Sequence, residues 1–172
     1  MALLVLSVAG SDRPGLTKAL AAAVLSAGGN WLESHLSRLG GLYVGSVLVE
    51  LAQGSHETLR AAVAAVDAQG LEVRIAPAAE SAKVAGETLE FSLVGQDRPG
   101  IVNQVTAAVS ELGANIETFE TWLSTEAHSG APLFHMAAHL RLPQGLAAAK
   151  VQAALEAISG EIMVDVAVGR AG

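Results

Sequence analysis

The chain has 172 residues, of which 51% are hydrophobic and 3% aromatic, which is the composition of packed helices and sheets and excludes a disordered protein. A net charge of −7, with ten scattered Lys and Arg residues, leaves no basic run that could follow a phosphate backbone, so direct nucleic-acid binding is not expected. The absence of cysteine excludes disulfides and thiolate metal sites.

The N-terminal run Met1–Ala9 is apolar, but no basic region precedes it and Asp12 follows closely. It therefore indicates a first strand and not a signal peptide. No stretch approaches the roughly 20 uninterrupted apolar residues that a membrane helix needs. Since the lack of cysteine also fits a reducing compartment, we expect a cytoplasmic protein without a membrane partner.

In chain order, the continuous apolar run Leu3–Ala9 predicts a strand buried in a sheet. Ser11–Pro14 then turns the chain into a helix, in which we expect Asp12 to accept the free amides of the first turn and Pro14 to begin the helix. The helix should end at Gly28, where a left-handed cap costs least. Its apolar stripe consists of Leu16, Leu20, Ala23, Val24 and Ala27.

Two strands should follow, Asn30–Leu39 and Leu42–Leu51, joined by the tight turn Gly40-Gly41. Leu42–Leu51 is apolar on both faces, which indicates that its outer face is partly covered, for example by the other half of the chain. The remaining elements of this half are a helix from the N-cap Ser55 to Gly70, with the stripe Leu59, Ala62, Val63 and Val66, and a strand Leu71–Ala76.

The same pattern then occurs again, 85 positions later. Ten of the 21 residues from 10 to 30 are identical in the repeat, including the turn Asp12-Arg13-Pro14-Gly15, which recurs as Asp97-Arg98-Pro99-Gly100, and Asn30, which recurs as Asn115. Such self-similarity indicates a duplicated domain. We predict a first domain at 1–77, a linker at 78–86 and a second domain at 87–172.

The elements expected in the second half match those of the first, and its helical stripe is Ile101, Val105, Ala108, Val109 and Leu112. One departure is the hairpin, where a longer loop, Thr125–Pro132, replaces the glycine turn. The predicted elements are the strand Thr88–Val94, the helix Pro99–Leu112, the strands Asn115–Ser124 and Leu133–Leu142, the helix Leu146–Ser159 and the strand Glu161–Ala167.

Each half therefore reads βαββαβ, which with right-handed crossovers gives an α+β, ferredoxin-like unit: a four-stranded antiparallel sheet with both helices on one face. Within Leu133–Leu142, apolar residues alternate with a mixed set that includes His135 and His139. The strand should thus have one face toward the helices and one outer face.

The Asp-Arg-Pro-Gly turn has two readings. As a structural device, Asp caps the helix, Pro begins it, and Gly lets strand and helix approach closely. This reading leaves unexplained why Arg13 and Arg98 both lie in the turn, and why Asn30 and Asn115 both begin the next strand. As a ligand site, free amides at a helix start suit a carboxylate, and an Asn side chain can pair with both carboxylate and ammonium.

We find no pattern for catalysis or for a metal. His135 and His139 share a strand face but lie ~13 Å apart at the rise of a strand, and the other histidines have no recognised ligand spacing. No phosphate-binding loop or nucleophile elbow occurs. We therefore expect no enzyme, no metal and no cofactor.

Tandem βαββαβ halves, each with Gly-x-Asp-Arg-Pro-Gly and a Gly-x-Asn about fifteen residues later, resemble the ACT domain, a regulatory module that binds amino acids. With two such halves, and with the run from Gly130 to Met136 after the second hairpin loop, the chain resembles the glycine cleavage system transcriptional repressor group. The resemblance covers the whole chain.

The resemblance implies two halves side by side in a continuous eight-stranded sheet, with amino-acid sites where the turn of one half meets the second strand of the other. It also implies a protein partner, a DNA-binding activator, in place of DNA. Carried onto this sequence, the site residues are Asp12, Arg13, Pro14, Gly15, Leu16, Asn30, Gln96, Asp97, Arg98, Pro99, Gly100, Ile101 and Asn115.

Two alternatives remain open at this stage. In one, the turns are structural only, and an exposed sheet edge or the hairpin loop docks a protein partner or a second copy of the chain, as in a homo-oligomer. In the other, the protein is an enzyme, since ACT-like halves also precede phosphatase and deformylase domains; the 172 residues leave no room for such a domain.

Overall fold

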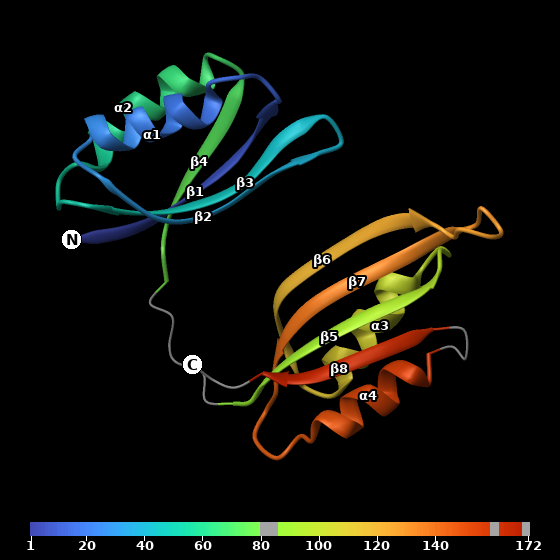
Figure 1. Cartoon of the computed structure of the whole chain (residues 1–172). Coiled ribbons are helices and arrows are strands. Elements are labelled where there is room, and N and C mark those ends of the chain that lie inside the picture. Colours follow the sequence, from blue (N-terminus) through green and yellow to red (C-terminus); the bar gives the residue numbers. More distant parts are fainter. Residues whose placement is uncertain (80–85, 159–161, 170–172) are drawn as a thin grey trace. The chain divides into compact units, whose positions relative to one another are not determined.

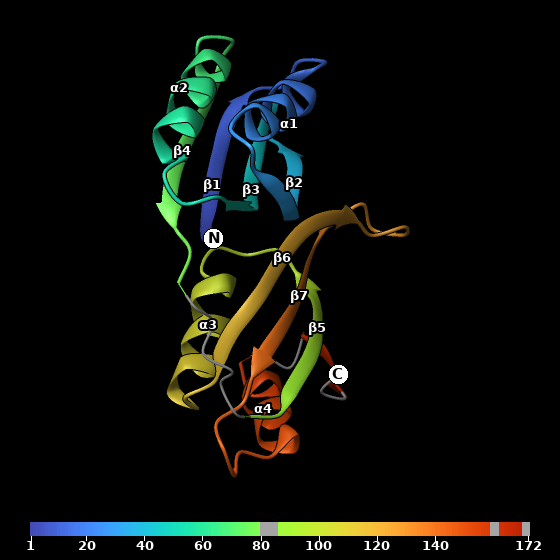
Figure 2. The same cartoon turned by 90° about the vertical axis from the view of Figure 1, so that its left-hand side faces the viewer.

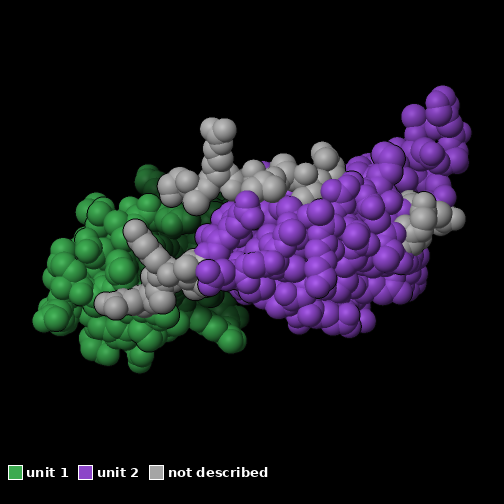
Figure 3. All heavy atoms as spheres, turned by 90° about the horizontal axis from the view of Figure 1, so that it is seen from below, with its two compact units in different colours: residues 1–82 green, residues 83–172 purple. Residues whose placement is uncertain are grey.

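The computed structural model describes residues 1–79, 86–158 and 162–169. The chain divides into two compact units, Met1–Ala82 and Lys83–Gly172, which Figure 3 shows in different colours. Each unit has its own sheet and its own core, and each is described by itself. The predicted linker 78–86 falls mostly outside the described residues, so the proposed domain boundary stays a prediction.

The first unit has the predicted order of elements (Figure 1). Its strands and helices are β1 (Ala2–Ser11), α1 (Leu16–Ser26), β2 (Asn30–Leu39), β3 (Leu42–Leu51), α2 (His56–Asp67) and β4 (Leu71–Pro77). The sheet order is β2-β3-β1-β4, with all neighbours antiparallel. Both helices lie on one face of the sheet.

The core of the first unit lies between that face and the helices. Leu6 on β1 is paired with Val47 on β3, and both side chains are fully buried. Leu20 of α1 and Leu59 of α2 are equally buried. The predicted helical stripes are confirmed, because their larger members all belong to this core cluster.

The second unit repeats the order, with sheet order β6-β7-β5-β8. Its elements are β5 (Thr88–Gln96), α3 (Ile101–Glu111), β6 (Asn115–Thr125), β7 (Pro132–Arg141), α4 (Ala148–Glu156) and β8 (Met163–Gly169). Both helices begin two residues later than predicted. The predicted ends at Ser159 and Glu161 lie outside the described residues.

The core of the second unit contains Phe91 on β5, Met136 on β7 and Leu155 on α4, all nearly inaccessible to solvent. The predicted alternation on β7 is confirmed: Phe134 and Met136 are buried against the helices, whereas His139 is exposed on the outer face. The ferredoxin-like α+β class is thus confirmed for both units. A continuous sheet across them stays a prediction.

The two hairpins differ as the sequence indicates. Gly40 and Gly41 have φ angles of 59° and 84°, and two positive values in succession suit the tight turn between β2 and β3. The β6–β7 loop is longer and held by its own hydrogen bonds: Glu126 N donates to Ala131 O (2.9 Å) and Gly130 N to Glu126 O (3.0 Å).

The edge strands β2 and β6 each contain a shift in their pairing register with the next strand of the hairpin, β3 or β7, which the sequence did not reveal. On β2 it lies between Trp31 and Glu33, and on β6 between Ile116 and Thr118. The extra residues of these β-bulges are therefore Leu32 and Glu117, which are equivalent positions of the repeat. A bulge bends the strand and increases its twist, here immediately after Asn30 and Asn115.

Candidate ligand-binding site

The duplicated turn has the same backbone geometry in both units. Gly15 has φ 93° and ψ −7°, and Gly100 has φ 87° and ψ −2°. These values match the third position of a type II β-turn, in which proline is common at the second. In the second unit the closing hydrogen bond runs from Ile101 N to Arg98 O (3.4 Å).

This geometry corrects the prediction for Asp12 and Pro14. Gly15 occupies the N-cap position of α1, no side chain caps the helix, and Pro14 precedes the first helical residue by two positions. Asp12 lies three residues before the N-cap, so its carboxylate instead pairs with Arg38 (Oδ2 to Nε, 3.0 Å). Ser55 is at the N-cap of α2 as predicted, but its side chain makes no capping hydrogen bond.

The role predicted for the turn glycine also needs correction. A methyl group built on Gly15 or Gly100 would have no atom within 4 Å, so glycine is required there for its positive φ and not for close packing. Close approach occurs at Gly10, where such a carbon would lie 2.2 Å from the carbonyl oxygen of Gly70.

Because no side chain caps α1 or α3, the first-turn amides that do not close the turn itself are available to an anion. Leu16 and Ile101, the first helical residues, are buried and fix each helix start against its core. Pro14, Pro99 and Gln96 are exposed. The backbone of each turn can thus receive a carboxylate group.

The two turn arginines make different contacts. The guanidinium of Arg13 donates to the backbone oxygen of Gln69, just after the end of α2. That of Arg98 donates to Gln104 Oε1 on α3 (2.6 Å). Arg13 therefore links its turn to the α2–β4 connection of the same unit, whereas the side-chain hydrogen bond of Arg98 goes to the helix that follows its own turn. This gives Arg13 a structural role that the sequence did not indicate.

The turn and the asparagine lie at opposite ends of each sheet. On β3, Glu50 pairs with both Asn30 and Leu3, whereas Leu42 pairs with Leu39 and Ser11. Asn30 is therefore level with the start of β1, and Asp12 follows its end, roughly 25 Å away at the rise of a strand. Asn115 and the turn of the second unit are separated in the same way. A single unit does not bring these predicted site residues together.

In the second unit, α3 lies beside β6 (Figure 2). A groove of about 480 Å³ runs between these two elements and is open to solvent. It extends from the first turn of α3 to the start of β6, and so includes Asn115. The sequence analysis did not predict the helical residues of this groove. The sequence does contain one indication of them, because several of these residues differ between the two copies of the repeat. The groove is lined by Asn103, Thr106, Ala107, Val109, Ser110, Ala114, Asn115 and Ile116.

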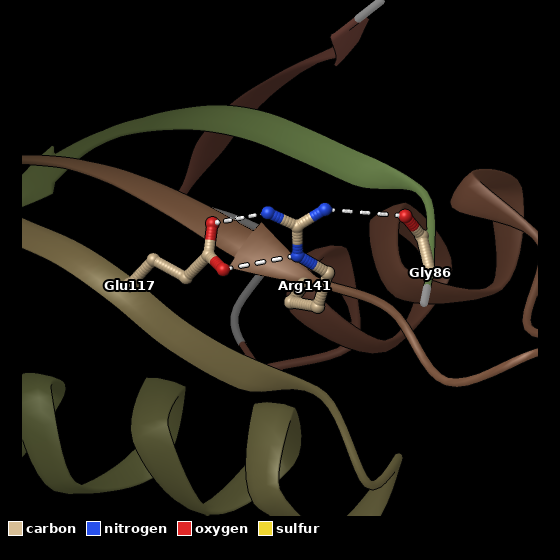
Figure 4. A network of polar contacts seen from close by, with 3 residues as sticks. All are labelled: Gly86, Glu117 and Arg141. Carbon is tan, nitrogen blue, oxygen red and sulfur yellow. Dashed lines mark hydrogen bonds and ion pairs between the residues drawn. The ribbon is translucent and has the colours of Figure 1, made fainter. Parts of the chain in front are cut away.

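A polar network fixes the neighbouring end of the sheet (Figure 4). Arg141 on β7 forms two hydrogen bonds to the carboxylate of Glu117, at 2.9 and 3.2 Å, and a third to the backbone oxygen of Gly86 (3.2 Å). Since Glu117 is the bulge residue of β6, the network holds the bulge next to Asn115, whose register partner is also Arg141.

Within the described residues, no group of three or more His, Cys, Asp or Glu side chains is placed to hold a metal ion. In the same part of the chain, no helix is both long and apolar enough to span a lipid bilayer.

The chain thus contains two βαββαβ units, and in each unit a glycine turn precedes a helix whose start is not capped by a side chain. These features define a class of small α+β modules that present backbone amides at one end. Residues 2–76 and 87–129 match the family model of the ACT domain, and the chain belongs to this family. ACT domains are typically ligand-binding regulatory modules.

Comparison with solved structures extends the match to nearly the whole chain. A protein of unknown function from Galdieria sulphuraria has a TM-score of 0.85 and 28% identity, covering 98% of this chain and 99% of its own. A proposed glycine cleavage system transcriptional repressor has a TM-score of 0.68 and 17% identity, covering 99% and 98%. No curated protein matches the chain.

Proposed function

We propose that the protein is a non-enzymatic regulator that binds a small amino acid, glycine being the first candidate, where two ACT units meet, and thereby controls a protein partner. The observation that carries the proposal is the duplicated type II turn in front of an uncapped helix, in a chain of the ACT family. Both turns leave helix amides for a carboxylate.

Since turn and asparagine lie far apart within one unit, a complete site needs two units. In the proposed arrangement, edge strands pair into a continuous eight-stranded sheet, and the turn of one unit approaches the asparagine of the other. The amides after Gly15 or Gly100 receive the carboxylate, and Asn115 or Asn30 pairs with the ammonium. The neighbouring residues Gln96, Asp97 and Pro99 shape the turn.

The proposed partner is a protein, with a transcriptional activator as the leading candidate. The net charge of −7 disfavours direct contact with nucleic acid. The structure with the TM-score of 0.68 is a proposed transcriptional repressor that shares the fold. A non-catalytic role and a cytoplasmic location are parts of the same proposal.

Calorimetric titration with each of the twenty amino acids tests the ligand. We expect at least one small amino acid to bind, and Asn115→Ala to weaken that binding. A matched control is Gln152→Ala, which removes a side-chain amide from α4, a helix that contains none of the predicted site residues. Flat titrations for all amino acids at millimolar concentration would contradict the proposal.

A second measurement is the melting temperature. A ligand that binds only the folded protein must raise it, in proportion to the logarithm of the free ligand concentration well above Kd. The same amino acid should therefore give both heat and a thermal shift. Heat without a shift would point to binding that does not depend on the folded sites.

The edge strand β6 favours a second candidate function, a constitutive interaction module without a small ligand. Phe119, Trp122 and Leu123 are 38%, 49% and 59% exposed on this strand, and an exposed apolar edge readily pairs with another chain. In this case Asn115→Ala and Arg98→Ala should leave partner or self-association intact, while changes within 125–131 abolish it. Loss of association in the first two variants would exclude this candidate.

A further inference from the structure

The groove between α3 and β6 has a lining that the equivalent positions of the first unit do not share. It contains polar side chains at four positions, Asn103, Thr106, Ser110 and Asn115, along an apolar floor that includes Val109 and Ile116. Three of the polar residues come from α3 and one from the start of β6. The groove thus connects the helix that follows the second turn with the asparagine of the second unit.

The chemistry of this lining suits a zwitterion. An amide side chain offers a donor to a carboxylate and an acceptor to an ammonium, and two amides are present. The hydroxyl of Thr106 already donates to Val102 O (2.9 Å), so its oxygen is left to accept a hydrogen bond. None of the lining residues is ionisable. A ligand with a net charge would therefore lose water without gaining a counter-ion.

The equivalent positions of the first unit have a different character. Asn103, Thr106 and Ser110 correspond to Lys18, Ala21 and Leu25. Leu25 is 75% exposed, and Lys18 and Ala21 are exposed as well. Of the four polar groups only the asparagine, Asn30, is retained. The first unit thus has a cation and aliphatic side chains where the second has neutral hydrogen-bonding groups.

We propose that the α3–β6 groove of the second unit, and not the equivalent surface of the first, receives the amino acid, so that each chain binds one ligand with a neutral side chain. This inference rests on the proposed function and adds which unit supplies the groove, how many sites there are and which ligands they take. The matching turn backbones alone would give two equivalent sites, and the difference between the two helical faces removes that equivalence.

The test exchanges the two linings. The double variant Thr106→Ala, Ser110→Leu gives the second unit the residues of the first, and the reciprocal variant Ala21→Thr, Leu25→Ser is the matched control. All four positions lie on helix surfaces, and the introduced residues already occur at the same place in the repeat. Each protein is titrated by calorimetry with glycine, alanine, serine, aspartate and lysine, and its fold is checked by circular dichroism.

We expect a stoichiometry of one ligand per chain for a neutral amino acid, with no comparable heat from aspartate or lysine. The exchange in the second unit should weaken this binding about tenfold or more, which corresponds to the loss of one or two hydrogen bonds. The reciprocal exchange should leave it unchanged.

Two outcomes would overturn the inference and leave the proposed function intact: two ligands per chain of equal affinity, or equal binding by the parent protein and the Thr106→Ala, Ser110→Leu variant. Preferred binding of aspartate or lysine would also overturn it, because the lining lacks a counter-ion. Absence of binding by any amino acid would overturn the proposed function, and this inference with it.

Discussion

At the scale of single residues, the two turn arginines should affect stability differently. Arg13 donates to the carbonyl of Gln69 beyond α2, whereas Arg98 contacts Gln104 on its own helix. Arg13→Ala should therefore lower the free energy of unfolding by about 1 kcal/mol, and Arg98→Ala by less than about 0.5 kcal/mol, as for an ordinary surface substitution. Urea unfolding measures both values. Equal losses would show that the contact of Arg13 has no structural importance.

Two glycines should respond to substitution for different reasons. Gly15→Ala adds a methyl group in open space at φ 93°, so only backbone strain opposes it, about 1 kcal/mol. Gly10→Ala places a carbon 2.2 Å from the backbone oxygen of Gly70, which forces β1 and β4 apart and costs about 2 kcal/mol or more. Thermal unfolding of the two variants gives the order. A larger effect at Gly15 would contradict this assignment.

At the scale of elements, the Glu117–Arg141 pair should stabilise the bulge of β6. The pair is half-buried, with 35% of the Glu117 side chain and 26% of the Arg141 side chain exposed. Arg141 forms two hydrogen bonds to Glu117 and donates a third to the carbonyl of Gly86. A double-mutant cycle with Glu117→Gln and Arg141→Lys should give a coupling of about 1 kcal/mol. If the bulge also positions Asn115, both single variants should weaken ligand binding. Coupling near zero would show that the pair contributes nothing to the bulge.

Most elements could be predicted from the sequence because their signals are local. The strands β2 and β3 follow from two ten-residue segments on either side of the turn Gly40-Gly41, and their observed bounds are those predicted. The helices α1 and α3 begin two residues later than predicted, because Pro-Gly belongs to a type II turn and not to the helix. The bulges at Leu32 and Glu117 leave no composition signal, since they depend on pairing across strands.

The candidate site was predictable only where the two copies agree. Identity between the halves points to the turns and to Asn30 and Asn115, but residues that serve the backbone geometry are identical for the same reason. The groove residues Thr106 and Ser110 differ between the halves, and their importance follows only from the structure, which brings them beside the start of β6. Locating a site in a duplicated domain therefore requires the positions at which the two copies differ as well as the positions at which they are identical.

At the scale of the whole molecule, the two cores are made of separate sets of residues, one from 4–71 and one from 89–162. Leu6 and Phe91 occupy equivalent positions of the repeat and are 0% and 1% exposed. Leu6→Ala should cost about 3 kcal/mol and Phe91→Ala about 4 kcal/mol, from lost burial and the cavity that remains. Because the cores share no residue, each loss should fall on its own unit.

Amide hydrogen exchange measured by mass spectrometry shows which unit each core substitution destabilises. Leu6→Ala should accelerate amide exchange within β1, β3 and β4 and leave β5 and β7 at the rate of the parent protein, and Phe91→Ala should do the reverse. Adding the bound amino acid should then slow exchange most in α3 and β6 of both variants, provided that the second unit is folded. If either substitution accelerated exchange in both units, the two cores would unfold as one cooperative structure. If the ligand slowed exchange only in α1 and β2, the first unit would be the one that binds it.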